Sequence, residues 1–287
     1  MKKIYLTTRL YNIDDKLRTC KLEKYLKEEI LDDIEIYMPY RDSDEESICA
    51  KNWKQDIFDM DIKAINNCDI LIGYLDGPEF DEGVGFEIGY ALTKQKSIYI
   101  INSDFVSYST NNIVSKQIDP LIEYLGINII SKKNYQIDNG DFCNSLEKLS
   151  QNLLDRIKLN KKDNITKLHR LPIKSGFFIE TGNGKLFSFL TKDQNVSNRD
   201  FTKHTAQDDI NNILSSKKVY ILSNGTEMYF GSAIIAGICY GLDIPYYIVD
   251  DRKVYLVGHN DITMKTNLMI DVATSGYIDI EEFIDEL

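Results

Sequence analysis

The two halves of this chain resemble each other. With an offset of 148 positions and no gap, acids and glycines of the first half coincide with identical residues of the second half: Asp61 with Asp209, Gly77 with Gly225, Glu79 with Glu227, Gly83 with Gly231 and Gly89 with Gly237. The apolar stretch 97–101 also falls on 245–249, in each case after a helix-like segment of matching length. A single frame that aligns glycines, acids and an apolar stretch indicates an internal duplication. The alternative is a chain of two unrelated α/β halves.

The first half alternates apolar stretches with helix-like segments. The pattern predicts strands at 3–6, 34–38, 69–75 and 97–101, helices at 16–31, at 83–95 and from about residue 47, and a polar loop at 39–46. A wholly apolar stretch such as 69–75 is typical of a strand buried on both faces of a parallel sheet. We therefore expect an α/β protein with doubly wound parallel sheets, which bind ligands beyond the carboxyl ends of their strands.

The length of the chain is sufficient for two such domains. It has 287 residues, and a polar, lysine-rich stretch at 159–164 predicts a linker between a domain at 1–158 and a domain at 165–287.

Composition excludes several classes of protein. Hydrophobic residues make up 43% and charged residues 28%, which is typical of a globular protein, and a net charge of -11 makes a nucleic-acid polymer an unsuitable partner. We find no secretory leader and no apolar stretch of about 18 residues, which predicts a cytoplasmic protein without membrane contact. The five cysteines form no CxxC pair and the three histidines have no ligand spacing, so we expect no metal site.

The segment 81–87 combines two glycines with three acids. Gly83 and Gly85 leave room for a ligand to lie against the main chain where a loop becomes a helix. Glu87 would lie near the start of that helix, where the positive end of the dipole favours the ionised carboxylate that a nucleophile attacking an anomeric carbon must have. Asp61, on the preceding helix, could protonate the leaving group. The same residues also fit an ordinary capped helix without a catalytic role.

The longer segment 68–92, CDILIGYLDGPEFDEGVGFEIGYAL, resembles the signature of the nucleoside 2-deoxyribosyltransferases, which are flavodoxin-like α/β enzymes. The resemblance covers roughly residues 3–130. It implies that Glu87 is the nucleophile, that Asp81 binds sugar hydroxyls and that Asp61 engages and protonates the base. It also implies that Tyr5, in the first strand, forms a hydrogen bond near the nucleophile.

The first loop departs from the family pattern. Small residues are usual there, whereas this chain has Thr7, Thr8 and Arg9. Arg9 could face a phosphate, as in relatives that hydrolyse nucleoside monophosphates. It could equally pair with one of the nearby acids, and we favour the ion pair.

The second half lacks the nucleophile. At the offset of 148, Glu87 falls on Ile235 and Asp81 on Tyr229. Family members build each site across a subunit interface, and the neighbour contributes an Asn-Leu-Met segment. The run 267–269 matches that segment, whereas the corresponding residues of the first half, 119–121, do not. The resemblance therefore implies two flavodoxin-like domains arranged as a pseudo-dimer, with one composite site to which Asn267 and Met269 contribute.

The expected function is exchange of the base of a 2-deoxynucleoside through a covalent deoxyribosyl intermediate on Glu87, with no cofactor. Its partners are a small nucleoside and a free base, and a homo-oligomer is compatible with the sequence. A hydrolase that uses the same glutamate on nucleosides or nucleoside monophosphates is the alternative. Asp81 would repel a 5-phosphate, which favours unphosphorylated substrates. A non-catalytic nucleotide sensor also stays open, although the first half retains all four site residues.

Overall fold

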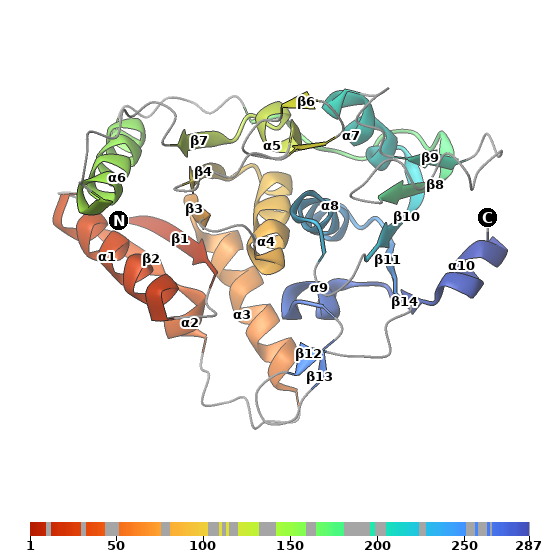
Figure 1. The fold of residues 1–287 in the computed structure, drawn as a ribbon, viewed down its shortest axis with the longest axis horizontal. Helices are drawn as coiled ribbons and strands as arrows, with labels where there is room; N and C mark the ends of the chain where they lie inside the picture. Colours follow the sequence, from red (N-terminus) through yellow and green to blue (C-terminus); the bar gives the residue numbers. More distant parts are fainter. Residues whose placement is uncertain are drawn as a thin grey trace.

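The computed structural model describes residues 1–9, 13–29, 33–43, 52–75, 81–102, 109–110, 113–114, 120–131, 142–158, 165–180, 196–198, 205–223, 228–250, 256–257, 263–264 and 266–286. Two five-stranded parallel sheets form the framework (Figure 1). The first has the order β2-β1-β3-β4-β7, with β1 Lys2–Thr8, β2 Ile34–Tyr37, β3 Ile70–Leu75, β4 Ser97–Asn102 and β7 Asn128–Ser131. The second has the order β14-β11-β10-β8-β9, with β8 Ser175–Glu180, β9 Val196–Asn198, β10 Ser216–Leu222, β11 Tyr246–Val249 and β14 Tyr277–Ile278.

The two sheets share one topology. When the strands are numbered within each half, both sheets have the order 2-1-3-4-5, which is the order of flavodoxin-like folds. All neighbouring strands in both sheets pair in parallel. The predicted fold class is therefore confirmed. The predicted linker at 159–164 lies outside the described residues.

Helices cover both faces of the first sheet. On one face α1 (Ile13–Glu29) and α6 (Phe142–Lys158) pack on Ile4 and Leu6 of β1, and on the other face α3 (Trp53–Asn67) and α4 (Glu82–Thr93) pack on Tyr5. Successive side chains of a strand point to opposite faces, which explains this division. The hydrophobic core on the α3 and α4 side continues without interruption into the second half.

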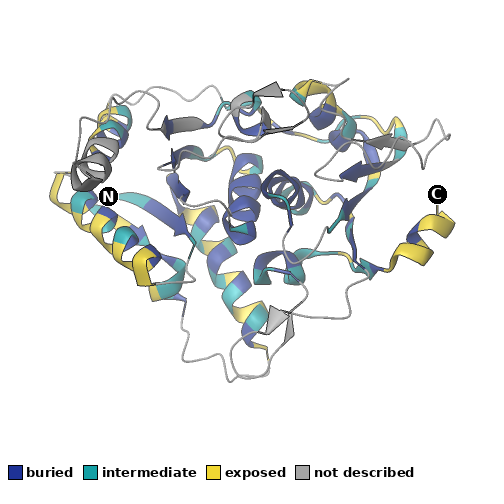
Figure 2. Ribbon diagram, in the orientation of Figure 1, coloured by how far each residue is buried: buried dark blue, intermediate teal, exposed yellow. Residues whose placement is uncertain are grey.

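Helices α4 and α8 (Phe230–Gly241) cross in the centre of the molecule, where Figure 2 shows both of them buried. A Cβ added to Gly89 would lie 2.0 Å from the carbonyl oxygen of Ile234, and one added to Gly237 would lie 2.0 Å from that of Phe86. The offset of 148 relates the two contacts, because Gly89 corresponds to Gly237 and Phe86 corresponds to Ile234. Contacts at a two-fold symmetric interface are related in the same way.

The caps of these two helices match as well. Gln95 and Asp243 follow α4 and α8, and both have a φ of 54°, in the left-handed region. Left-handed residues commonly end helices because they turn the chain away from the helix axis. The two caps are again 148 residues apart.

The predicted polar loop at 39–46 contains a short helix, α2 (Pro39–Asp42). Proline at the first helical position and a hydrogen bond of 2.7 Å from the backbone N–H of Met38 to Asp42 stabilise this turn. The helix predicted from about residue 47 begins at Trp53 in the structure, and 44–51 lie outside the described residues.

The remaining described elements are short: α5 (Pro120–Tyr124), α7 (Ala206–Leu214), α9 (Leu268–Ala273), α10 (Ile280–Glu286) and the antiparallel pairs β5–β6 (Ser109–Thr110, Ile113–Val114) and β12–β13 (Leu256–Val257, Thr263–Met264). None of the helices in the described parts of the chain has the length and apolar composition needed to cross a bilayer.

Candidate active site

Asp81 caps the helix that carries the predicted nucleophile. Its Oδ1 accepts a hydrogen bond of 3.1 Å from the backbone N–H of Val84, in the first turn of α4. A capping carboxylate satisfies an N–H group that has no partner within the helix, and the helix dipole stabilises its charge. The cap thereby fixes the direction in which α4 leaves the carboxyl edge of the first sheet.

Glu87 lies six residues beyond this cap and is 4% exposed. Its Oε1 accepts a hydrogen bond of 2.7 Å from the hydroxyl group of Tyr5, which is fully buried on β1. A hydrogen bond from a buried tyrosine fixes the rotamer of the carboxylate. The structure thus brings together the two residues that the sequence placed 82 positions apart.

Burial raises the pKa of Glu87. The nearby Asp61 carboxylate raises the pKa further, whereas the hydroxyl groups of Thr7 and Tyr5 oppose the shift. The expected stabilisation of the ionised form by the helix dipole is outweighed, because the dipole acts mainly within the first turn and Glu87 lies beyond it.

Asp61 has a matching environment. It projects from α3, is 3% exposed, and its Oδ1 accepts a hydrogen bond of 2.8 Å from the hydroxyl group of Tyr37. Burial raises the pKa of Asp61, although the bond from Tyr37 works in the opposite direction. The rings of Tyr5 and Tyr37 are stacked, with centroids 5.4 Å apart. The two carboxylates therefore accept hydrogen bonds from two tyrosines that contact each other.

Tyr37 was missed by the sequence analysis. It is the last residue of β2 and pairs directly with Tyr5 in the parallel register. A tyrosine at the carboxyl end of a strand next to β1 is the signal that could have identified it, since neighbouring parallel strands present their ends at the same edge.

Asn267 brings the second half to the same place. It caps α9, its Oδ1 accepts a hydrogen bond of 3.0 Å from the backbone N–H of Met269, and its Nδ2 lies 3.5 Å from Oδ1 of Asp81. A Cβ on Gly83 would lie 2.8 Å from Oδ1 and 2.9 Å from Nδ2 of Asn267. Gly83 therefore permits the close approach of the Asn267 side chain to the start of α4.

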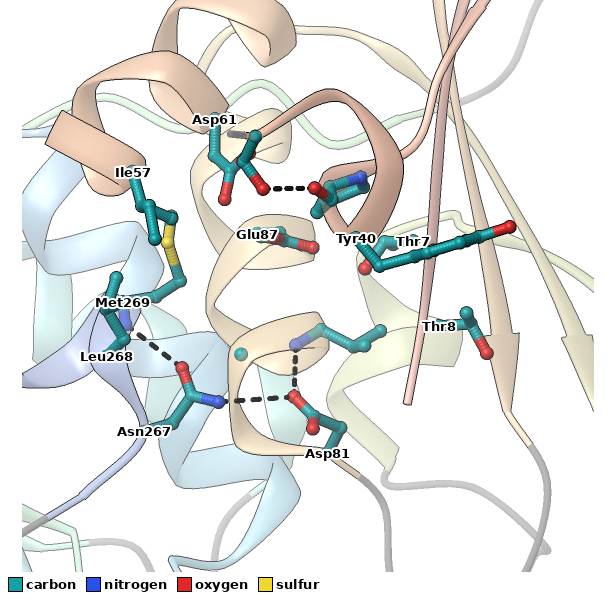
Figure 3. Close-up of a pocket in the computed structure, with 14 residues that line it drawn as sticks. Thr7, Thr8, Tyr40, Ile57, Asp61, Asp81, Glu87, Asn267, Leu268 and Met269 are labelled. Atoms are coloured by element: carbon teal, nitrogen blue, oxygen red, sulfur yellow. Dashed lines mark hydrogen bonds between the residues drawn. The ribbon is translucent and has the colours of Figure 1, made fainter. Parts of the chain in front are cut away.

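These residues surround a cavity of about 210 Å³, shown in Figure 3. Its lining includes six of the predicted site residues: Asp61, Asp81, Gly83, Glu87, Asn267 and Met269. The lining also includes residues that were not predicted as site residues: Thr7, Thr8, Pro39, Tyr40, Ser43, Ile57, Val84 and Leu268. The two threonines are the last residues of β1, at the point where the sequence departs from the family pattern, and that departure was the signal for them.

Two predicted site residues have other positions. Tyr5 lies behind Glu87 and reaches the site through its hydrogen bond. Gly85, expected to bind substrate, instead faces helix α8, where an added Cβ would lie 2.9 Å from the Cβ of Ala233 and 3.1 Å from the ring of Phe230. In the structure Gly85 leaves room for a neighbouring helix, and it is not among the residues that line the cavity.

The charge of the cavity is negative. Its charged lining residues within the described parts of the chain are the carboxylates Asp61, Asp81 and Glu87. Arg9 does not line the cavity; its Nε donates to Oδ2 of Asp15 at 3.2 Å, which is the ion pair that we favoured. Such a cavity is suited to the hydroxyl groups of a sugar and to a nitrogenous base that accepts a proton.

The fold and the cavity together define the class of protein. A flavodoxin-like sheet with a cavity beyond the carboxyl ends of its strands is typical of an α/β protein that binds a small molecule, and two buried carboxylates line this cavity. The family model for nucleoside 2-deoxyribosyltransferase matches residues 4–154 of this sequence. The match spans more than half of the chain, and the chain therefore belongs to this family, as the resemblance predicted.

One solved structure, described as the crystal structure of a conserved protein from Enterococcus faecalis V583, is 24% identical in sequence. The alignment covers 55% of this chain and 98% of that chain, with a TM-score of 0.37. A search of curated proteins gave no match.

Proposed function

We propose that the protein exchanges the base of 2-deoxynucleosides, with the chemistry located at 1–158 and a degenerate second copy at 165–287 that completes the cavity. The observation that carries this proposal is the geometry of Glu87: a buried carboxylate, oriented by Tyr5, in a cavity that it shares with Asp61. A nucleophilic carboxylate and an acid on one substrate cavity are the two groups that a retaining glycosyl transfer requires.

The reaction proceeds in two displacements. An oxygen of Glu87 bonds to the anomeric carbon while the bond from this carbon to the base breaks, and the base leaves with the bonding electrons and a proton from Asp61. A nitrogen of the second base then attacks the anomeric carbon, Glu87 leaves as a carboxylate, and Asp61 takes up a proton. Asp81 and Asn267 are placed to bind the hydroxyl groups of the sugar.

Burial raises the pKa of both carboxylates, to about 8 for Glu87 and about 7 for Asp61. Burial disfavours two negative charges in one cavity, so the pair tends to retain a proton. The proposed reaction starts from the form of the pair in which this proton is on Asp61 and the negative charge is on Glu87. A poorly solvated carboxylate is also well placed to stabilise the positive charge that develops on the sugar.

The second half is proposed to be a copy that lost its own chemistry. The common strand order, the reciprocal contacts of Gly89 and Gly237 and the matching caps after α4 and α8 support a duplication. Where Glu87 has a carboxylate, the second half has Ile235, which is fully buried in α8. The retained contribution of this half is the segment that begins at Asn267.

The negative lining of the cavity favours an uncharged nucleoside over a nucleotide, because Asp81 and Asn267 occupy the sugar-binding end and Asp81 would repel a 5-phosphate. Hydrolysis of nucleosides, in which water replaces the second base, uses the same residues and is distinguished by its products.

The test incubates the protein with a 2-deoxynucleoside, with and without a second free base, and follows all products by chromatography. A new nucleoside indicates a transferase, sugar and base alone indicate a hydrolase, and binding without products indicates a sensor. We expect Glu87→Ala to abolish turnover and Asn267→Ala to reduce it. The control Ile235→Ala should retain turnover at temperatures where it is folded, although the cavity that it leaves costs about 2–5 kcal/mol of stability. Full activity in Glu87→Ala would refute the mechanism.

A further inference from the structure

Glu82, the first residue of α4, links the two halves beside the cavity. It stands between Asp81 and Gly83, which both line the cavity, but its own side chain is 7% exposed and points toward the second half. Its Oε1 accepts a hydrogen bond from the backbone N–H of Met228. Its Oε2 accepts one of 3.1 Å from the backbone N–H of Asn267. One carboxylate thus holds two backbone positions of the other half.

The bond from Glu82 completes the fixation of Asn267. The side chain of Asn267 is already engaged through its Oδ1, which accepts from Met269, and through its Nδ2, which faces Asp81. Glu82 adds a bond to the backbone of the same residue. A hydrogen bond from an N–H to a buried carboxylate is among the stronger ones in proteins, because the acceptor is charged.

The sequence does not repeat this carboxylate at the equivalent position of the second half. The crossing of α4 and α8 is reciprocal under the offset of 148, but at the same offset Glu82 corresponds to Phe230. Phenylalanine has no acceptor for a backbone N–H. Of the two equivalent positions, the one with the carboxylate is in the half that carries Glu87, and its partner is the Asn-Leu-Met segment.

We propose that Glu82 is a positioning residue: it sets the wall of the cavity by holding the backbone of Asn267, and thereby determines how the sugar lies relative to Glu87. This proposal rests on the proposed function, because it assigns Asn267 to substrate binding. Displacement of a binding group by about 1 Å can reduce a rate by about 100-fold, so the position of this wall matters for catalysis.

A simpler role for Glu82, as one of several contacts that dock the halves, makes a different prediction. Lys54 on α3 forms an ion pair of 2.8 Å with Asp271 on α9, outside the cavity lining. Lys54→Met therefore serves as the matched control: it removes a contact with the same helix α9 without changing the bonds of Asn267.

The experiment compares Glu82→Gln and Lys54→Met in the full chain. Glutamine keeps one acceptor oxygen but turns its amide group toward a second N–H donor, so one of the two bonds is lost. We expect Glu82→Gln to lower kcat/KM by roughly 10-fold to 100-fold and Lys54→Met to lower it by less than about 3-fold. In an Asn267→Ala background, Glu82→Gln should cause less than about a 2-fold further loss, because the two residues act as one unit.

Hydrogen–deuterium exchange supplies a readout that does not depend on catalysis. The segment 266–273 should exchange faster in Glu82→Gln than in the wild type, while the control segment 97–102 should not change. If the wild type lacks activity, the proposed function fails, and the exchange measurement still decides whether Glu82 holds Asn267. Should Glu82→Gln fail to fold, Glu82→Asp takes its place, with the same direction of change expected because the shorter carboxylate cannot reach both N–H groups.

Four results would overturn the proposal, three of them in the Glu82 variant itself. Those three are kcat/KM within about 2-fold of the wild type in the Glu82 variant, an equal loss in the Asn267→Ala background, and unchanged exchange of the segment 266–273. An equal loss of kcat/KM in Lys54→Met would also overturn it, because the effect would then follow from weaker docking in general.

Discussion

Replacement of Gly89 by alanine should push helices α4 and α8 apart where their backbones approach each other closely. The new Cβ would lie 2.0 Å from the carbonyl oxygen of Ile234 and 2.9 Å from its carbonyl carbon. An ordinary contact between such atoms is roughly 3.5 Å, so the helices must move apart by more than about 1 Å. Both contact atoms belong to the backbone, and no change of side-chain rotamer can relieve the overlap.

Overpacking of this kind costs about 3 kcal/mol or more, which lowers the melting temperature of a protein of this size by roughly 6–12 °C. Thermal denaturation followed by circular dichroism measures the change. Gly237→Ala should give a similar loss, because its Cβ would lie 2.0 Å from the carbonyl oxygen of Phe86. Gly73→Ala is the control: its nearest neighbour would be Cδ1 of Ile88 at 3.4 Å, an ordinary contact. A melting temperature of Gly89→Ala within about 2 °C of the wild type would refute the reasoning.

Two further predictions follow from the carboxylate pair. Burial raises the pKa of Glu87, so the stability that its protonated form contributes is present at low pH and is lost as the pH rises through the raised value. Glu87→Gln cannot ionise, and its melting temperature should exceed that of the wild type at pH 9, by a margin that shrinks toward pH 5; a margin independent of pH would contradict this. Tyr37→Phe removes the hydrogen bond that lowers the pKa of Asp61. Because the proposed acid must hold a proton, the pH at which kcat/KM declines should move upward in Tyr37→Phe, and a profile that stays in place or moves downward would remove Tyr37 from this role.

The composite cavity gives a reason for the retention of the second half. Asn267 and Asp81 are 186 positions apart in sequence, yet their side chains lie within 3.5 Å at the start of α4. The second half therefore supplies part of the wall of a cavity whose carboxylates, among the described residues, all come from the first half.

The sequence by itself determined the elements and the centre of the site. The sequence predicted the apolar strand β3, the glycines and acids that follow it, and the position of Glu87 on α4. These features could be predicted because strand burial and helix capping depend on residues close together in the chain. The repeat likewise predicted two sheets, and both have the same strand order.

Only the tertiary structure decided which distant groups meet. Gly83 and Gly85 look alike in sequence, but one faces Asn267 beside the cavity and the other faces α8. Tyr37 could not be assigned to Asp61 until β2 was placed beside β1. Glu82 looks like an ordinary acid in the first turn of a helix, whereas its partners are backbone N–H groups of the other half. Local pattern reports the conformation and burial of a residue, but the partner of a buried polar group depends on how remote segments pack.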